Sequence, residues 1–417
     1  MTPGMLRQRR LANGLGKTGA WFVASRLAQL ASGVWITRQL DQQDFVFLAV
    51  IFAIQGFAQQ LGSLNLSSEL VRKNSISNPD LEVAWSYELV RNLIIWSALT
   101  GFSPVFAGWM GHPELGGTIR ISALGFIITS FRNPRIIELR RKGEFGRLGW
   151  IDAFPLLVYA LCAAWFVFLS PTFESLVLAG LVSASSGVLL TYWGLPWKPR
   201  LRFDFKRARP MIAFGMTLLV GTSLFAVREH GVVFLVSARG YGAELGYLNR
   251  ATAFSMAFAL QFVGIFWKVA YPHYSTVRLQ GGDVARDANH ASIFLIAFCL
   301  PLALLAALFS SHLIHFALGG KWANIAPLWS WFAVAGAFLL ANAPMEAALQ
   351  ALRREKIQVA IVAVSTTLHF LISWALLPAH GISAIGIGAV ISLMISSLLL
   401  HLAMRSTAHL TKPNSNE

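Results

Sequence analysis

Charged side chains lie inside stretches of this sequence that are otherwise apolar, and these charges are the residues with the clearest chemistry. A charge placed in a lipid bilayer costs free energy, so such a residue usually faces a cavity, a partner or the membrane surface. Arginine is suited to phosphate, because its fork of N–H groups matches two phosphate oxygens and it stays charged when desolvated. The basic residues of this kind are Arg26, Arg91, Arg120, Arg132, Arg228, Arg250 and Lys268, and the acidic ones are Glu88, Asp152, Glu229 and Glu346.

Four of the arginines are candidates for binding an anionic phosphate group. Arg26 lies near the middle of the apolar segment 16–37 and has no acidic residue next to it in sequence. Arg228 lies deep in a long apolar segment, Arg250 lies about one turn inside the next one, and Arg91 lies in an earlier one. Fixed cations in a water-filled cavity lower the barrier for moving a diphosphate through a low-dielectric region. We therefore predict that Arg26, Arg228, Arg250 and Arg91 bind a diphosphate.

Two acids are candidates for ion coupling. Glu229 is the deepest acid and adjoins Arg228 and His230. Glu88 precedes Arg91 by three residues, a spacing at which two helical side chains can pair. The alternative interpretation is that each acid only neutralises its neighbouring arginine.

The remaining charges have plainer interpretations. Asp152, Arg120 and Lys268 lie close to the ends of their apolar segments, where a long side chain reaches the membrane surface. Arg132 and Glu346 also lie near segment ends, where surface contact or structural pairing explains them. The histidines are scattered without ligand spacing and no phosphate loop occurs, so we expect no metal and no cofactor.

The elements that must hold these charges are membrane helices. Of the 417 residues, 55% are hydrophobic and only 13% are charged, about half of the share typical of a soluble domain. A membrane helix needs about 20 mostly apolar residues. The sequence predicts twelve such spans, at 16–37, 45–65, 82–108, 117–137, 148–170, 173–193, 209–238, 246–271, 289–316, 324–350, 356–377 and 382–403.

The distribution of Lys and Arg predicts the orientation of these spans. The net charge is +15, because 34 basic residues stand against 19 acidic ones. With both termini in the cytoplasm, the basic clusters at 7–17, 135–147, 198–209 and 353–356 all lie inside, as the positive-inside rule requires. The excess charge is therefore a topology signal and not a mark of nucleic-acid binding. The long span 209–238 could be two short helices broken at 228–230, but this orientation favours one continuous helix.

Two halves of the chain resemble each other at an offset of 200 residues. The segment 40–47 follows the first span as segment 240–247 follows the seventh, and each precedes a helix that contains glutamines. We predict an N-terminal six-helix bundle at 1–195, a basic cytoplasmic linker at 196–208 and a C-terminal six-helix bundle at 209–417. Duplicated halves of this kind are typical of secondary transporters.

Several motifs resemble those of one family of membrane proteins. The run Gly246-Tyr247-Leu248-Asn249-Arg250-Ala251 looks like the family motif GYYNRA, and residues 320–328 look like its G-x-x-W-x-x-A-x-P-L segment. Residues 348–354 look like the L-x-A-x-G-R exit, and residues 40–45 look like the L-x-x-x-x-F turn, although Val46 replaces the usual glycine and Leu352 the glycine of Gly-Arg. The sequence thus resembles the Wzx-type O-antigen and exopolysaccharide flippases of the multidrug/oligosaccharidyl-lipid/polysaccharide exporter superfamily.

This resemblance implies an all-α membrane protein with two pseudo-symmetric six-helix bundles around a central cavity. It implies a non-enzymatic flippase that moves a polyprenyl-diphosphate oligosaccharide across the inner membrane for surface polysaccharide biosynthesis. Alternating access coupled to an ion gradient would drive it, since the sequence contains no ATPase motif. Possible protein partners are a polysaccharide polymerase and a chain-length regulator. Aromatic and amide side chains that could contact the sugars are Trp35, Gln55, Gln59, Tyr247, Asn249 and Gln261.

Two other functions stay open at the level of sequence. The first is an enzyme, a polysaccharide polymerase or an O-antigen ligase, but such proteins usually carry a large outside loop that this chain lacks. The second is a drug or cation exporter of the same superfamily. A cationic substrate would favour carboxylates in the cavity, whereas the deep charges here are mainly basic.

Overall fold

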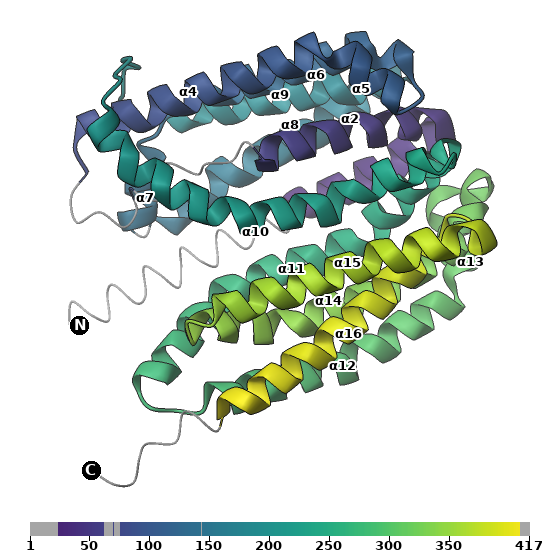
Figure 1. Cartoon of the computed structure of the whole chain (residues 1–417). Coiled ribbons are helices and arrows are strands. Elements are labelled where there is room, and N and C mark those ends of the chain that lie inside the picture. Colours follow the sequence, from purple (N-terminus) through teal and green to yellow (C-terminus); the bar gives the residue numbers. More distant parts are fainter. Residues whose placement is uncertain (1–23, 62–69, 71–75, 143, 409–417) are drawn as a thin grey trace, which may run out of the picture. The chain divides into compact units, whose positions relative to one another are not determined.

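The protein is described by a computed structural model over residues 24–61, 70, 76–142 and 144–408. Within these residues the regular elements are helices, and no strand occurs (Figure 1). The chain divides into two compact units, Met1–Ala226 and Val227–Glu417. Helix α10, Phe205–Ala238, continues through this division, so its last residues belong to the second unit. The boundaries predicted from sequence, with a linker at 196–208, stay a prediction.

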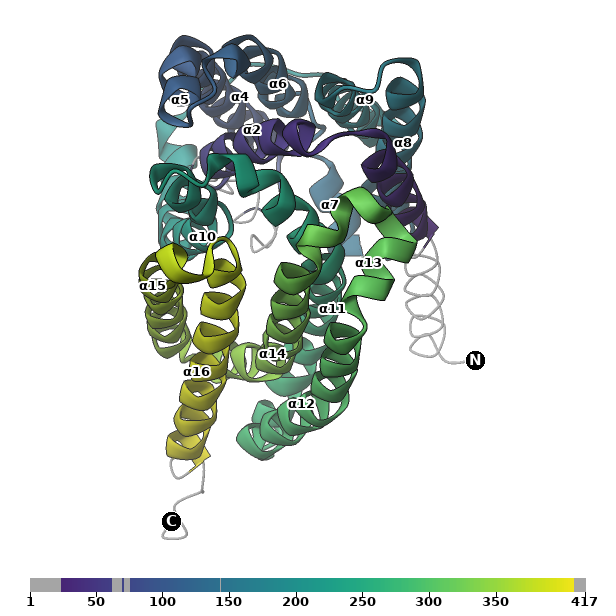
Figure 2. The same cartoon turned by 90° about the vertical axis from the view of Figure 1, so that its right-hand side faces the viewer.

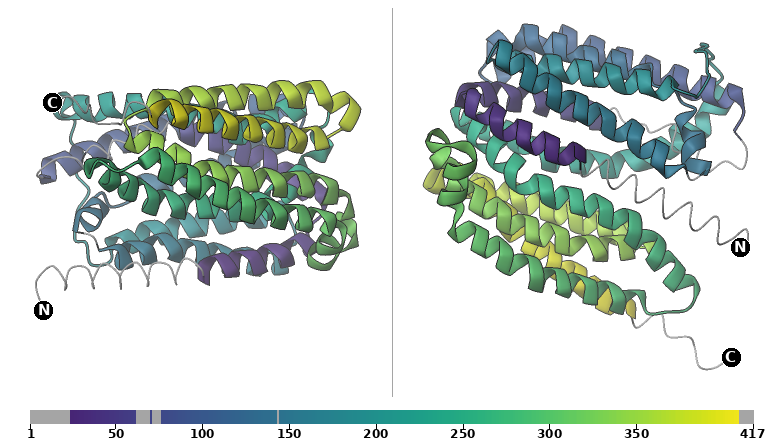
Figure 3. Two further views of the ribbon diagram at one scale, coloured as in Figure 1. Left: turned by 90° about the horizontal axis from the view of Figure 1, so that it is seen from below. Right: turned by 180° about the vertical axis from the view of Figure 1, so that it is seen from behind.

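The first unit begins with a helix over 24–39 and continues through helices that pack side by side. Helix α4 packs on α6, α6 on α9, and α8 on α9, as the lower and rear views also show (Figure 3). The elements are α2 (Gln42–Leu61), α4 (Asn78–Gly101), α5 (Ser103–Trp109), η1 (Pro113–Leu115), α6 (Gly116–Ser130), α7 (Ile136–Lys142), α8 (Phe145–Leu169) and α9 (Phe173–Tyr192).

The second unit is arranged around α14. Helices α11, α12 and α16 all pack on α14, and α15 packs on α16 (Figure 2). The most apolar part of the helix that contains α14 is 67% buried, whereas that of α12 is only 6% buried, so α14 is the central helix and α12 a peripheral one. The elements are η2 (Gly242–Glu244), α11 (Leu245–Leu279), α12 (Val284–Leu308), α13 (Ser310–Leu318), η3 (Gly320–Ile325), α14 (Ala326–Ala351), α15 (Glu355–His380) and α16 (Ser383–Ala408).

The two units repeat one order of elements. In the first, a long helix, a short helix, a 3-10 turn and three further helices follow as α4, α5, η1, α6, α8 and α9. In the second, the same order is α12, α13, η3, α14, α15 and α16, and the corresponding pairs of helices pack together. The short α7 is an addition to the first unit. The predicted pseudo-symmetry of two bundles is therefore confirmed.

Several predicted spans differ from the observed helices. The span predicted at 82–108 is two helices, because the chain bends by 59° between α4 and α5. Pro104 lies in the first turn of α5, where its missing N–H costs no hydrogen bond. The span predicted at 289–316 is likewise divided between α12 and α13 at Phe309. The span predicted at 117–137 ends early, since α6 stops at Ser130.

Within the described residues, six helices are long and apolar enough to cross a membrane. The bent pair of α4 and α5 makes a seventh if it is counted as one span. The first part of the span predicted at 16–37 lies outside the described residues. The span predicted at 209–238 is one continuous helix, α10, as the charge distribution favoured.

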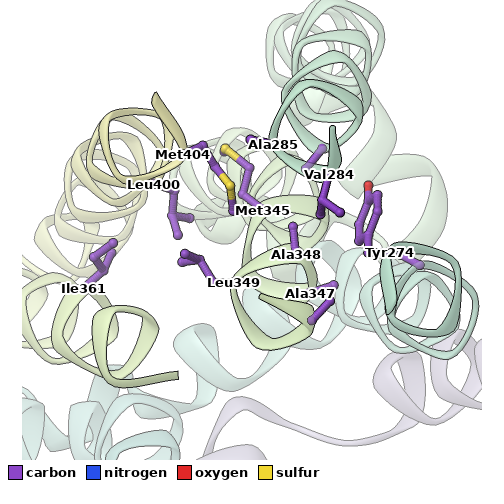
Figure 4. Close-up of a cluster of buried hydrophobic side chains, with 13 residues drawn as sticks. Tyr274, Val284, Ala285, Met345, Ala347, Ala348, Leu349, Ile361, Leu400 and Met404 are labelled. Atoms are coloured by element: carbon purple, nitrogen blue, oxygen red, sulfur yellow. The ribbon is translucent and has the colours of Figure 1, made fainter. Parts of the chain in front are cut away.

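A cluster of small and sulfur-containing side chains forms the core at one end of the second unit. Met345, Ala348 and Leu349 of α14 lie between Tyr274 of α11 and Met404 of α16 (Figure 4). These side chains are at most 3% exposed. The alanines allow α11 and α12 to approach α14 closely, which fixes the turn of α14 that carries Glu346.

Candidate functional site

Arg26 is held by the side chain one turn further along its helix. Its Nη1 donates a hydrogen bond of 2.8 Å to Oε1 of Gln29. Ser32 continues the same polar side, where its Oγ donates to the carbonyl of Gln29 at 3.1 Å. The first predicted helix thus carries a polar stripe that orients a partly buried guanidinium.

Arg91 and Arg250 share a second arrangement, in which an adjacent asparagine accepts two bonds from the guanidinium. Arg91 donates through Nε and Nη2 to Oδ1 of Asn92, at 3.2 and 2.9 Å. Arg250 donates through the same atoms to Oδ1 of Asn249, at 3.2 and 2.6 Å. An amide oxygen is neutral, so it orients a guanidinium without cancelling its charge. Glu88 also interacts electrostatically with Arg91, and whether this neighbour alone explains the two charges stays a prediction.

Arg228 is the centre of an electrostatic group within the second unit. It acts on its neighbour Glu229, on Glu346 of α14 and on His369 of α15. The turn that follows Arg228 lies against α15, because a Cβ added at Gly231 would come within 2.7 Å of Cζ of Phe370. Arg228 and Glu346, which lie far apart in sequence, thus interact electrostatically within the second unit.

His369 is a buried histidine of α15 that is 8% exposed. Within the described residues its Nε2 has no hydrogen-bond partner. Helix α16 presses on this ring, since a Cβ added at Gly388 would lie 3.2 Å from Cδ2 of His369.

A polar face surrounds His369 along α15 and its neighbours. Ser365 donates to the carbonyl of Ser392 at 3.1 Å, and Asn342 of α14 donates to the carbonyl of Leu393 at 3.3 Å. Further side-chain oxygens are buried there without a partner among the described residues: Asn342 Oδ1, Thr366 Oγ1 and Ser373 Oγ. Buried polar atoms are nearly always satisfied in proteins. This face therefore offers three buried oxygens that a water molecule would satisfy.

The predicted ion-coupling acids differ in surroundings. The side chain of Glu229 is exposed, whereas Glu88 and Glu346 are partly buried. Both Glu229 and Glu346 have Arg228 as an opposite charge. Whether any of these acids binds an ion stays a prediction.

The residues that were predicted to contact sugar differ in burial and in the side chains that they contact. The ring of Tyr247 packs edge-on against Trp322, with 6.2 Å between ring centroids, and Trp322 is 1% exposed. Asn249 is engaged by Arg250. Trp35 and Gln55 are partly buried and Gln59 is exposed, while the side chain of Gln261 lies outside the described residues. Their role toward sugar stays a prediction.

Three of the charges that were given plain interpretations contact polar side chains, namely Arg132, Asp152 and Arg120. Arg132 and Asp152 form a half-exposed ion pair at 3.0 Å, so Arg132 is explained by pairing. Arg120 donates from Nε to Oγ of Ser103 at 2.8 Å. The side chain of Lys268 lies outside the described residues.

The turn at 40–45 has a clear structural reason. Leu40 and Phe45 are fully buried. Between them, Asp44 accepts backbone N–H bonds from Asp41 at 3.0 Å and from Phe173 at 3.1 Å. The second bond satisfies a free N–H at the start of α9, so the motif joins two parts of the first unit.

The polar face of α15 was not among the predicted site residues. Ser365, His369 and Ser373 recur every four residues, and this periodicity was available in the sequence as a sign of a polar helix face. Among the described residues, no group of three His, Cys, Asp or Glu side chains could hold a metal ion.

A protein-family model described as "Polysaccharide biosynthesis protein" matches residues 35–327, which is more than half of the chain. The lipopolysaccharide biosynthesis protein WzxC of Escherichia coli K12 is 21% identical over 76% of this chain and 65% of its own. The teichuronic acid biosynthesis protein TuaB of Bacillus subtilis 168 is 23% identical over 67% of this chain and 58% of its own. The chain thus spans about three fifths of the length of these two relatives.

Solved structures of membrane transporters share the fold. The lipid II flippase MurJ in an inward closed conformation matches with a TM-score of 0.77 and 14% identity, over 94% of this chain and 89% of that one. An inward-facing multidrug resistance transporter of the MATE family matches with a TM-score of 0.73 and 16% identity, over 94% and 96%. Their fold has twelve helices, which confirms the predicted fold class. At these identities the likeness concerns the fold alone.

Proposed function

Because the chain belongs to the polysaccharide biosynthesis protein family, we propose that it is a flippase for a polyprenyl-diphosphate-linked oligosaccharide. In this proposal the repeat unit passes from the inner to the outer leaflet of the inner membrane by alternating access, and the protein forms no covalent intermediate. The protein itself is a multi-pass membrane protein of that family, and its described regular elements are helices.

Membership of this family and the arginines in its helices together support an anionic, lipid-linked substrate. Arg26, Arg91 and Arg250 each donate to a neutral amide oxygen. The fork of a guanidinium matches phosphate oxygens, and a lipid diphosphate is an anion of this kind. Side chains that bind a drug cation would instead be carboxylates, so the arginines favour the anionic substrate over a drug or cation exporter.

The energy for transport is proposed to come from an ion gradient, with Glu229 and Glu88 as candidate ion-binding acids. The polysaccharide polymerase and the chain-length regulator remain proposed partners. Both termini are proposed to be cytoplasmic. Reporter fusions placed after Glu417 and within 240–245 test this orientation, since a cytoplasmic signal from 240–245 would contradict it.

Reconstituted transport is the direct test of the proposed function. The full chain is placed in liposomes whose inner leaflet carries a fluorescent polyprenyl-diphosphate oligosaccharide, and a membrane-impermeant quencher reports its arrival outside. Faster quenching than in empty liposomes is expected. A matching preparation with a fluorescent phosphatidylcholine controls for general lipid scrambling. Equal rates for the two lipids, or no acceleration of either, would contradict the proposal.

A further inference from the structure

The chain between α9 and the first turn of α10, residues 193–209, forms a strap on the surface of the first unit. Four large apolar side chains of the strap are between 61% and 69% exposed, namely Trp193, Leu201, Phe203 and Phe205. Four exposed basic side chains lie among them and have no acidic partner in the described residues, namely Lys198, Arg200, Lys206 and Arg209. We propose that the strap binds anionic phospholipid headgroups at the membrane surface.

The strap is fixed in place before any lipid binds. Asn133 donates from Nδ2 to the backbone carbonyl of Leu195 at 2.8 Å, which anchors the beginning of the strap. The backbone N–H of Arg202 donates to Oγ of Ser86 in α4 at 2.8 Å, which anchors its middle. The guanidinium of Arg202 also pairs with Glu82 of α4 at 3.2 Å. A surface that is ordered in advance loses little conformational entropy when it binds.

The strap lies where two membrane helices reach the membrane surface. Helix α9 is long and apolar enough to cross a membrane and ends at Tyr192, and α10 contains the span predicted at 209–238. Exposed aromatic side chains at such a junction are typical of the interface between lipid and water. The ring of Phe203 packs edge-on against Tyr87 of α4, with 5.9 Å between ring centroids, which holds it in position. The apolar side chains of the strap therefore enter the bilayer beside the basic ones.

The basic side chains of the strap form two groups. Arg202 and Arg207 pair with acids of the first unit and hold the strap, the latter through Asp80 at 3.1 Å. The four that lack an acidic partner leave their charge uncompensated. Each lysine or arginine close to an anionic membrane surface raises the affinity about fivefold. Long side chains of this kind bury their apolar stem while the charged end reaches the headgroups.

Helix α7 extends the same charge beside the strap. Its Ile136 and Leu139 pack with Leu195 of the strap in one buried cluster. The last turn of α7 carries the exposed Arg141 and Lys142. The basic side chains are thus spread along the surface instead of converging on one point, which matches a layer of separate phosphates and not a single diphosphate. For this reason the occupant is the phospholipid of the membrane and not the transported substrate.

The test uses the full chain in nanodiscs of phosphatidylcholine with a small share of spin-labelled lipid. Electron spin resonance gives the fraction of label that the protein immobilises, and therefore its preference for phosphatidylglycerol over phosphatidylcholine. The parent should prefer phosphatidylglycerol severalfold at low salt, and high salt should weaken this preference. The strap variant loses the four unpaired charges and most of the preference, through Lys198→Gln, Arg200→Gln, Lys206→Gln and Arg209→Gln.

A matched control removes four exposed basic side chains from the second unit, through Arg286→Gln, Arg353→Gln, Lys356→Gln and Arg405→Gln. This control variant has the same net charge as the strap variant, but its strap is intact. It should therefore keep most of the preference for phosphatidylglycerol. An equal loss in the two variants would show attraction through net charge alone and would overturn the inference, as would a parent without any preference.

A further arm distinguishes the phospholipid from the substrate. If undecaprenyl diphosphate at a far lower mole fraction displaces labelled phosphatidylglycerol from the parent but not from the strap variant, the strap belongs to the substrate and the inference is wrong. If the strap variant does not fold, the changes at 198 and 200 and those at 206 and 209 are measured as two separate pairs. Each pair should lose part of the preference, and no loss in either would contradict the inference. None of these measurements involves transport, so the proposed function is tested independently.

Discussion

Nη1 of Arg207 lies 3.1 Å from Oδ1 of Asp80, and this ion pair fastens the first turn of α10 to the start of α4 within the first unit. Asp80 is 4% exposed and also closes a capping box with Ser77 at the beginning of α4. A second pair reinforces the contact, since Arg202 lies 3.2 Å from Glu82. The basic segment before α10 is therefore bound to a specific place on its own unit.

Removing the carboxylate of Asp80 should weaken the first unit. Asp80→Ala deletes a helix cap and leaves Arg207 without a buried partner, so we expect a loss of about 1 to 3 kcal/mol. Thermal unfolding in detergent measures the change. Glu144→Ala is the matched control, because its pair with Arg147 at 3.8 Å is well exposed and should contribute less than about 1 kcal/mol. An equal effect of the two changes would contradict the structural role of Asp80.

Replacing Arg26 should abolish transport and not folding. A buried cation costs about 2.5 kcal/mol or more on insertion scales, so Arg26→Ala should insert and fold at least as well as the parent. It should nevertheless fail to support surface polysaccharide, because the diphosphate loses its bidentate partner. Arg26→Lys should be partly active, since lysine keeps the charge but not the fork.

Arg38 provides the control for Arg26 on the same helix. It is an exposed arginine at the far end of the helix over 24–39, so Arg38→Ala should leave polysaccharide export intact. Export is measured as surface polysaccharide in cells that depend on the variant. Full export by a well-folded Arg26→Ala protein would remove Arg26 from the diphosphate site.

Glu229→Gln distinguishes ion binding from charge neutralisation. If Glu229 binds the coupling ion, the variant should lose ion-driven transport while its melting temperature stays unchanged. If Glu229 only neutralises Arg228, removing its charge should lower stability, because Arg228 then keeps only Glu346 as an opposite charge. Transport and thermal unfolding are measured side by side on the same preparation. Transport at the parent's rate would exclude Glu229 from ion coupling.

Gly388→Ala tests the close contact between α15 and α16. The added methyl group would lie 2.5 Å from Oγ of Ser373 and 3.1 Å from the carbonyl of His369. Such overpacking costs about 1 to 3 kcal/mol, so the melting temperature should fall. Gly264→Ala in α11 is the control, since nothing lies within 4 Å of its added methyl group. A similar fall for both variants would show that the contact at Gly388 is not tight.

The fold was predictable from sequence to the extent that hydropathy encodes it. The order of the spans, the continuous α10 and the two similar halves all follow from apolar length and basic loops. The breaks at Phe102 and Phe309 did not follow, because the few polar residues beside them do not interrupt a long apolar segment and a bend between helices leaves the mean hydropathy almost unchanged. The early end of α6 was hidden in the same way, since Phe131 extends the apolar stretch beyond Ser130.

The candidate site was only partly predictable for a different reason. Single charges in apolar segments are visible in sequence, and this identified Arg26, Arg91, Arg228 and Arg250. Their partners depend on contacts between helices, so the relation of Arg228 to Glu346 and His369 required the structure. The burial of the His369 ring was equally invisible, because it depends on how closely Gly388 of α16 approaches α15.

The repeated order of elements also bears on how such a chain can arise by tandem duplication. A unit with an even number of crossings returns the polypeptide to the side on which it began. A second copy fused behind it is therefore already in the correct orientation and needs no additional crossing. The irregular stretch from Trp193 to Asp204, between α9 and α10, is all that such a fusion requires. With the six crossings that the sequence predicts for each half, a short junction suffices, whereas an odd-numbered unit would have required an inverted copy.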